Sequence, residues 1–187
     1  MTFHSRVAAA EDLLRARGAA EVPHPGGTLL DHLRRVRVEL AAWDAPPEVQ
    51  LAGLCHASYG TDGFDTALLD LAERPVLTEA IGAEAESLVY LYGSCVRAHV
   101  YPQLGQEEVE FVDRFTDVLR TPDRASLSAF MEITAANELD VVRHNPAIAA
   151  EHGPALHELV IRASRHLSDK ARRAWTDQAA RTGVAAE

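Results

Sequence analysis

Two histidines lie in apolar segments that follow one another along the chain, and histidine is the side chain best suited to proton transfer near neutral pH. His32 lies in the apolar run 28–36, and His56 lies in the run 51–64, which ends in a glycine-flanked loop. If both segments are helices, both histidines point toward one interior, where they form either a site or a hydrogen-bonded core pair. We expect a site, in which His56 is the catalytic base and His32 is its partner.

Four more residues could complete this site. Tyr59 follows His56 by about one helical turn and could donate a hydrogen bond to a developing oxyanion, although a core aromatic is the alternative. We expect the substrate to be bound by His24 in a loop rich in proline and glycine, by Thr61 and by Asn137. The expected chemistry is acid–base catalysis on a small organic molecule: isomerisation, elimination, cyclisation or hydrolysis.

The elements that must position these residues are helices. β-branched and aromatic residues form no alternating runs, whereas alanine, leucine, arginine and glutamate dominate, which indicates an all-α domain. Thr28 and Asp31 have the spacing of a capping box. The segment 48–59 is apolar around almost its whole circumference, so we expect it to be the central helix. Together the patterns predict helices over 5–18, 28–43, 48–59, 66–72, 77–81, 84–96, 106–119, 124–142, 149–163 and 168–182, and a frayed tail over 183–187.

Length and charge narrow the possible functions. A chain of 187 residues with no internal repeat or linker suits a single domain over 1–187. The net charge of −10 argues against nucleic acid and anionic membranes as partners, and a small organic substrate is expected instead. Arg34, Arg35 and Arg37 are interpreted as a solvated helix face.

The cysteines and the chain's hydropathy indicate a location. Cys55 and Cys95 lack metal-type spacing and are interpreted as small buried residues of a reduced, cytoplasmic protein, with a disulfide as the alternative. No apolar stretch is long enough for a membrane span, and the N-terminus lacks the features of a signal peptide.

The two histidine segments resemble the HD-domain superfamily. The pattern of that superfamily is a first histidine on one helix, a His-Asp pair ending the next helix, and a late aspartate. The segment 51–60 resembles the one that holds the pair, and 133–139 resembles the late helix, so the resemblance spans about 28–139. It implies an all-α, HD-domain-like helical bundle with a central cavity, in which many members bind metal.

The chain departs from the pattern at both carboxylates. Ala57 stands where the aspartate of the pair is expected, and Asn137 stands where the late aspartate is expected. Hard divalent ions prefer anionic oxygen ligands, so we expect a weakened metal site and favour no cofactor. A single divalent metal remains possible, because three histidines are a ligand set that zinc accepts. The residues of that alternative are His24, His32 and His56 with Asp62 or Asp140.

Three functions follow from these residues. The leading prediction is an enzyme that acts on a small molecule by histidine acid–base chemistry. The second is a metal-dependent HD-type hydrolase or oxygenase. The third is a non-catalytic protein that binds a small molecule in the same pocket.

Overall fold

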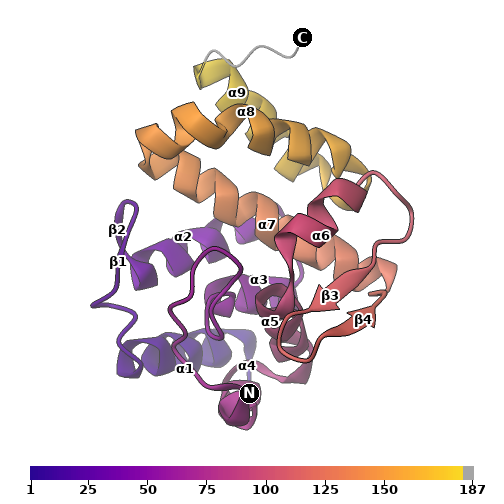
Figure 1. Ribbon diagram of the computed structural model, residues 1–187. Helices are drawn as coiled ribbons and strands as arrows, with labels where there is room; N and C mark the ends of the chain where they lie inside the picture. The colour runs from indigo at the N-terminus through magenta and orange to yellow at the C-terminus, as the bar shows by residue number, and fades with distance from the viewer. Residues whose placement is uncertain (183–187) are drawn as a thin grey trace.

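The computed structural model describes residues 1–182, and this part of the chain is mainly α-helical, which confirms the predicted fold class (Figure 1). Its helices are α1 (Phe3–Ala16), α2 (Leu29–Ala42), α3 (Pro47–Cys55), α4 (Arg74–Ile81), α5 (Ala83–Ser94), α6 (Arg97–Val100), α7 (Arg124–His144), α8 (Pro146–Arg162) and α9 (Asp169–Thr182). Short 3-10 turns cover Leu71–Glu73, Tyr101–Gln103 and Ser164–His166. The tail 183–187, for which fraying is predicted, lies outside the described residues.

Two small antiparallel hairpins complete the structure. β1 (Pro23–His24) pairs with β2 (Gly27–Thr28), and β3 (Phe111–Asp113) pairs with β4 (Val118–Arg120). In Figure 1 the β1–β2 hairpin stands beside the start of α2, while the β3–β4 hairpin lies on the other side of the molecule, near α5 and α6. Only the first hairpin takes part in the site described below.

α3 is the central helix, as its apolar circumference predicts. It packs against α1, α2, α5 and α7, and every residue from Leu51 to Cys55 is buried. Gly53 faces α2 so closely that a Cβ atom there would overlap Cδ1 of Leu40. The missing side chain at Gly53 therefore allows the close approach of α2 and α3, the helices that lead to His32 and His56.

α2 begins with the predicted capping box. The Thr28 hydroxyl accepts a hydrogen bond from the Asp31 amide at 3.2 Å, and the Asp31 carboxylate accepts one from the Thr28 amide at 3.1 Å. Its buried stripe consists of Leu29, Leu30, His32, Leu33, Val36 and Leu40. His32 therefore faces the interior, as its position on the apolar stripe predicts.

α3 is shorter than predicted. It ends at Cys55, His56 is its C-terminal cap residue, and the predicted extension to 59 is wrong. The chain turns away because the Ser58 carbonyl accepts hydrogen bonds from the amides of Leu68 and Leu69. Gly60 then adopts a φ of +69°, a conformation that glycine reaches without strain.

Two other predicted helices are wrong. Residues 66–70 form a loop, and α4 begins at Arg74 with Pro75 in its first turn, where the missing amide hydrogen of proline costs nothing. The segment 106–119 contains the β3–β4 hairpin instead of a helix. The hairpin is held by the buried carboxylate of Asp113, which accepts a hydrogen bond from Tyr90 at 2.8 Å and forms an ion pair with Arg120 at 2.9 Å.

The C-terminal helices form a layer over the rest of the chain (Figure 1). The long α7 contacts α2, α3 and α5 on one side and α8 and α9 on the other. Trp175 anchors α9 by donating an indole hydrogen bond to the Ala135 carbonyl at 3.1 Å. In residues 1–182 there is no helix that combines the length and the apolar character of a membrane span.

Both cysteines have the predicted environment. Cys55 and Cys95 are buried and free, so no disulfide joins them. Burial raises the pKa of the Cys95 thiol to about 12 and that of Cys55 still further. Neither thiol is therefore ionised near neutral pH, and both act as small packing groups.

Candidate functional site

A pocket of about 470 Å³ lies where the β1–β2 hairpin, α2, the loop after α3, α6 and α7 meet. A larger hollow of about 620 Å³ lies between α3, α5 and α7, but no histidine lines it. The smaller pocket brings together five of the six residues proposed from the sequence. Its polar lining consists of His24, His32, His56, Thr61, Arg97, Asn137, Glu138 and His152.

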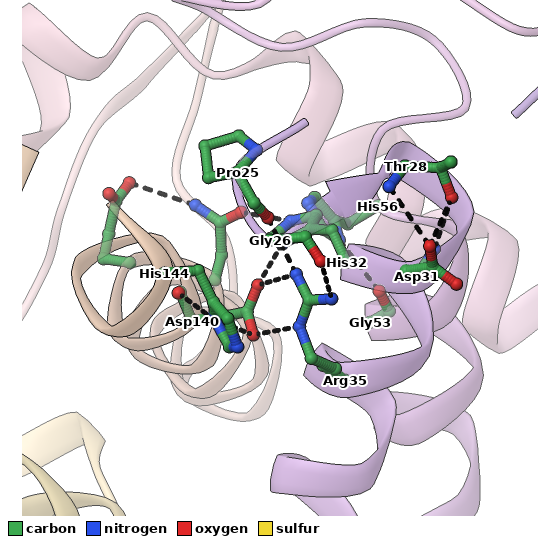
Figure 2. Close-up of polar contacts among 12 residues, drawn as sticks. Pro25, Gly26, Thr28, Asp31, His32, Arg35, Gly53, His56, Asp140 and His144 are labelled. Atoms are coloured by element: carbon green, nitrogen blue, oxygen red, sulfur yellow. Dashed lines mark hydrogen bonds and ion pairs between the residues drawn. The ribbon is translucent and has the colours of Figure 1, made fainter. Parts of the chain in front are cut away.

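His56 presents an unprotonated ring nitrogen to this pocket. Its Nδ1–H donates a 2.8 Å hydrogen bond to the Gly53 carbonyl, three residues back at the end of α3 (Figure 2). In a neutral ring this leaves the lone pair on Nε2, which makes no hydrogen bond within the described part of the chain. Burial and the positive charge of neighbouring His32 lower the pKa of His56 to about 3. The side chain is only 2% exposed, so its neutral form is fixed by the fold.

His32 differs from His56 because both of its ring nitrogens are engaged. Nδ1 lies 2.7 Å from Oδ2 of Asp140, and Nε2 lies 3.0 Å from Oδ1 of Asn137. The Asn137 amide is oriented by its Nδ2–H, which donates to Glu138 at 3.1 Å, so the oxygen faces His32. Both partners are acceptors, and in this arrangement the His32 ring donates through both nitrogens as an imidazolium. His32 therefore supplies charge to the pocket, while His56 supplies the base.

Asp140 holds this arrangement through contacts with His32, Arg35 and His144 (Figure 2). Its carboxylate contacts His32, accepts two hydrogen bonds from Arg35 at 2.7 and 3.0 Å, and lies 3.2 Å from Nδ1 of His144. Burial alone would raise the pKa of Asp140, but the hydrogen bonds from His32 and Arg35 outweigh it and lower the pKa to about 2. The carboxylate is therefore ionised and is the counter-ion of two cations.

Arg35 also fixes the hairpin that carries His24. Its guanidinium donates to the carbonyls of Pro25 at 2.9 Å and Gly26 at 3.2 Å (Figure 2). The His24 ring stacks on the His32 ring with centroids 4.0 Å apart. Burial, followed by the charge of His32, lowers the pKa of His24 to about 4. His24 is thus a neutral ring held against a charged one.

The interpretation of the arginine cluster as a solvated face is wrong for two of its members. Arg35 pairs with Asp140, and Arg34 pairs with Glu11 on α1. Arg35 lies three residues after His32, so the two side chains share one face of α2, and that spacing is a signal the sequence contains.

Arg97 and Glu138 are pocket residues that sequence reasoning missed. Arg97 Nη1 donates to Oε1 of Glu138 at 3.2 Å, and its backbone amide donates to the Asp62 carboxylate at 2.7 Å. Glu138 directly follows Asn137, but successive side chains on a helix point in different directions, so adjacency alone does not predict its place in the pocket. Arg97 begins the four-residue α6, and no pattern in the sequence points to it.

The structure does not bring Tyr59 to the pocket. Its hydroxyl donates to Oε1 of Glu86 at 2.9 Å, and the Glu86 carboxylate is also held by Arg74 at 2.7 and 2.9 Å. The spacing argument fails because α3 ends at Cys55, so Tyr59 is not one helical turn beyond His56. Tyr59 is therefore part of a buried packing network.

The residues present do not fit the metal site that the HD resemblance implies. Ala57 lines the pocket without a ligand atom, and the amide oxygen of Asn137 is already paired with His32. Asp62 binds the Arg97 amide, and Asp140 is shared by His32 and Arg35. Among residues 1–182, no group of three or more histidine, cysteine, aspartate or glutamate side chains is arranged to hold a metal ion.

Comparison with known proteins gives one similarity. A family model described as a domain of unknown function, DUF6817, matches residues 13–97. The comparisons with curated proteins and with solved structures gave no match. The matched region contains His24, His32, His56 and Thr61 and ends at Arg97, whereas Asn137 and Glu138 lie beyond it. Over this region the chain is similar to a domain of unknown function, and that domain supplies most of the pocket.

Proposed function

We propose that the chain is an enzyme that uses His56 as an acid–base group on a small organic molecule. We also propose that its framework is HD-like, with the metal-binding carboxylates replaced by Ala57 and Asn137. The observation that carries the proposal is the Nε2 atom of His56, which has no protein partner within residues 1–182 and is not among the enclosed polar atoms that lack one. In this respect His56 differs from His32, whose two ring nitrogens are both engaged. The ring of His56 lines a pocket together with other polar groups.

The surroundings of His56 suit proton transfer. The hydrogen bond from Nδ1–H to the Gly53 carbonyl fixes the tautomer, so a substrate proton can be accepted only at Nε2. The low pKa keeps the Nε2 lone pair of His56 unprotonated throughout the neutral range. It also makes His56 a weaker base than a free imidazole, because base strength falls with pKa. The imidazolium of His32 stabilises negative charge that develops in the pocket, and Thr61 offers a hydroxyl to the substrate. Isomerisation, elimination, cyclisation and hydrolysis are all reactions of this type.

The proposed partner is a small organic substrate, and neither nucleic acid nor a membrane. The net charge of −10 supports this proposal, because a nucleic-acid or anionic-membrane surface requires an excess of basic residues. The two buried free thiols support a cytoplasmic location, because reducing compartments keep cysteines unpaired.

The test is turnover in the presence and absence of the His56 side chain. The wild-type protein and the His56→Gln variant are incubated in D2O with a mixture of small metabolites, and products or deuterium incorporation are followed by mass spectrometry. Loss of a general base lowers turnover by about 100-fold or more. The exposed His4 provides a matched control, and His4→Gln should keep the wild-type rate.

Two outcomes would contradict the proposal. Equal turnover in wild type and His56→Gln would remove the role of His56, and binding of a compound without any turnover would favour a passive binding protein. Elemental analysis of protein purified without chelator or histidine tag is the companion measurement. Stoichiometric iron, manganese or zinc that is lost in His56→Ala would favour the metal-dependent alternative.

A further inference from the structure

The ion pair of Arg97 and Glu138 forms part of the pocket wall, in the same pocket as His56. The side chain of Arg97 is 28% exposed and that of Glu138 is 12% exposed, and both residues line the pocket. Asp62 fixes the backbone of Arg97 through its amide. The charge of Arg97 contributes to the low pKa of His56, which places the guanidinium within electrostatic range of the base.

Both members of this pair have hydrogen-bonding capacity to spare. Arg97 uses Nη1 for Glu138, its Nη2 lies 3.5 Å from the Tyr92 hydroxyl, and its Nε has no partner in the described structure. Glu138 accepts from Arg97 and from Asn137 at the single atom Oε1, so Oε2 has no partner among residues 1–182. None of these spare atoms is among the enclosed polar atoms that lack a partner there. They are therefore accessible, and both residues line the pocket.

The charges around Arg97 and Glu138 disfavour the binding of a simple anion. Arg97 is flanked by the carboxylates of Asp62 and Glu138, and the Arg35 and His32 cations behind the pocket are matched by the shared carboxylate of Asp140. A carboxylate that binds Arg97 alone would approach Glu138 and be repelled by it. A ligand that also presents a hydrogen-bond donor to Oε2 of Glu138 forms a hydrogen bond there, and this bond offsets the repulsion.

We infer that the pocket binds a small carboxylic acid that carries an amino or hydroxyl group on its α-carbon. Its carboxylate takes the free donors of Arg97, and its α-substituent donates to Oε2 of Glu138. Because this inference names the substrate class of the proposed enzyme, it rests on the proposed function, but it makes a separate prediction about binding.

Binding is measured without turnover by following the Nε–H resonance of Arg97 in ¹⁵N NMR spectra, assigned with Arg97→Lys. The probes are glycolate, glycine, acetate and methylammonium. Glycolate or glycine should shift the resonance, and acetate should bind about tenfold or more weakly because it offers no donor to Oε2 of Glu138. Methylammonium should not bind, since it has no carboxylate for Arg97.

The variants separate the amino from the hydroxyl class. Glu138→Gln keeps an acceptor for a hydroxyl group but loses the charge that holds an ammonium group. It should weaken glycine by about tenfold and glycolate by only a few-fold. Arg143 pairs with Glu39 on the outer surface of α7, so Arg143→Gln is the matched control and should change neither affinity.

The inference is overturned if no probe shifts Arg97, or if acetate binds as tightly as glycolate and glycine. The ranking of the four probes on the wild-type protein decides this even if an Arg97 variant fails to fold. His56→Gln should retain probe binding, because the subsite is made by Arg97 and Glu138. Probe binding together with full turnover in His56→Gln would therefore refute the proposed function and leave the subsite standing.

Discussion

At the scale of single residues, Asp140 is the group on which the pocket depends most. It is the shared counter-ion of Arg35 and His32, and through Arg35 it fixes the hairpin that carries His24. The stacking of His24 on His32 therefore depends on a carboxylate that never reaches the pocket lining.

Replacing this carboxylate should be costly. Asp140→Asn leaves the buried His32 and the partly exposed Arg35 without their shared counter-ion, and we expect a loss of about 3–5 kcal/mol in the free energy of unfolding. Urea denaturation followed by circular dichroism measures it. Glu39→Gln removes the partner of Arg143 in a surface pair and should cost less than about 1 kcal/mol. Similar losses in the two variants would show that Asp140 has no special role.

The sequence contained part of this residue-scale picture. The sequence predicts that His32 and His56 face the same interior, because each lies in an apolar helical segment. Helical periodicity places the residues of such a segment's apolar face in the core. The bond that sets the tautomer of His56 is local, to the Gly53 carbonyl three residues back. The hydrogen bonds that engage both nitrogens of His32 could not be predicted, since they join α2 to a helix more than 100 residues later. Arg97 was missed for the same reason, because its place in the pocket depends on how α6 packs.

At the scale of elements, the contact between α2 and α3 brings the two histidines together. Their rings meet edge to face with centroids 5.3 Å apart, and Gly53 allows the close approach of the two helices. Gly53 also provides the carbonyl that accepts from His56. One glycine therefore serves both the helix packing and the tautomer of the base.

Adding a methyl group at Gly53 should force the two helices apart. Gly53→Ala is expected to lower the free energy of unfolding by about 1–3 kcal/mol, because its Cβ overlaps Leu40 in a packed core. Gly153 is also helical, but a Cβ there meets nothing within 4 Å. Gly153→Ala should therefore be neutral or stabilise by up to about 1 kcal/mol. A Gly53→Ala variant as stable as the wild type in chemical denaturation would contradict the close approach.

The elements that were predicted correctly are those specified by local signals. The start of α2 follows from Thr28 and Asp31, and the central position of α3 follows from its apolar circumference. The segment 106–119 was mistaken for a helix because Asp113, which holds the hairpin, is satisfied by Tyr90 on α5. No local sequence pattern indicates the contact between Asp113 and Tyr90.

At the scale of the whole molecule, the half-buried His24 and the buried His56 make stability depend on pH. His24 and His56 have pKa values of about 4 and about 3 in the folded chain, against an ordinary value of 6.5. Below pH 6.5 the unfolded chain binds protons that the folded chain does not, so stability falls as the pH falls. Asp140, with its lowered pKa, adds a further loss only below about pH 4.

Between pH 6.5 and 5 we expect each of the two histidines to remove about 1–2 kcal/mol of unfolding free energy. Urea denaturation at several pH values measures this dependence. His56→Gln should show a shallower dependence, whereas the exposed His4→Gln should follow the wild type. A stability that stays constant from pH 6.5 to 5 would show that the two histidines are not buried in their neutral forms.

The central claim is that His56 offers an unprotonated Nε2 to the pocket while its Nδ1–H is held by Gly53. The most direct measurement is the ¹⁵N NMR spectrum of the histidine rings at pH 7 and pH 5, with His56 assigned through His56→Gln. We expect a neutral ring protonated at Nδ1 at both pH values. A ring protonated at Nε2, or one that titrates with a midpoint near the ordinary value of 6.5, would contradict it.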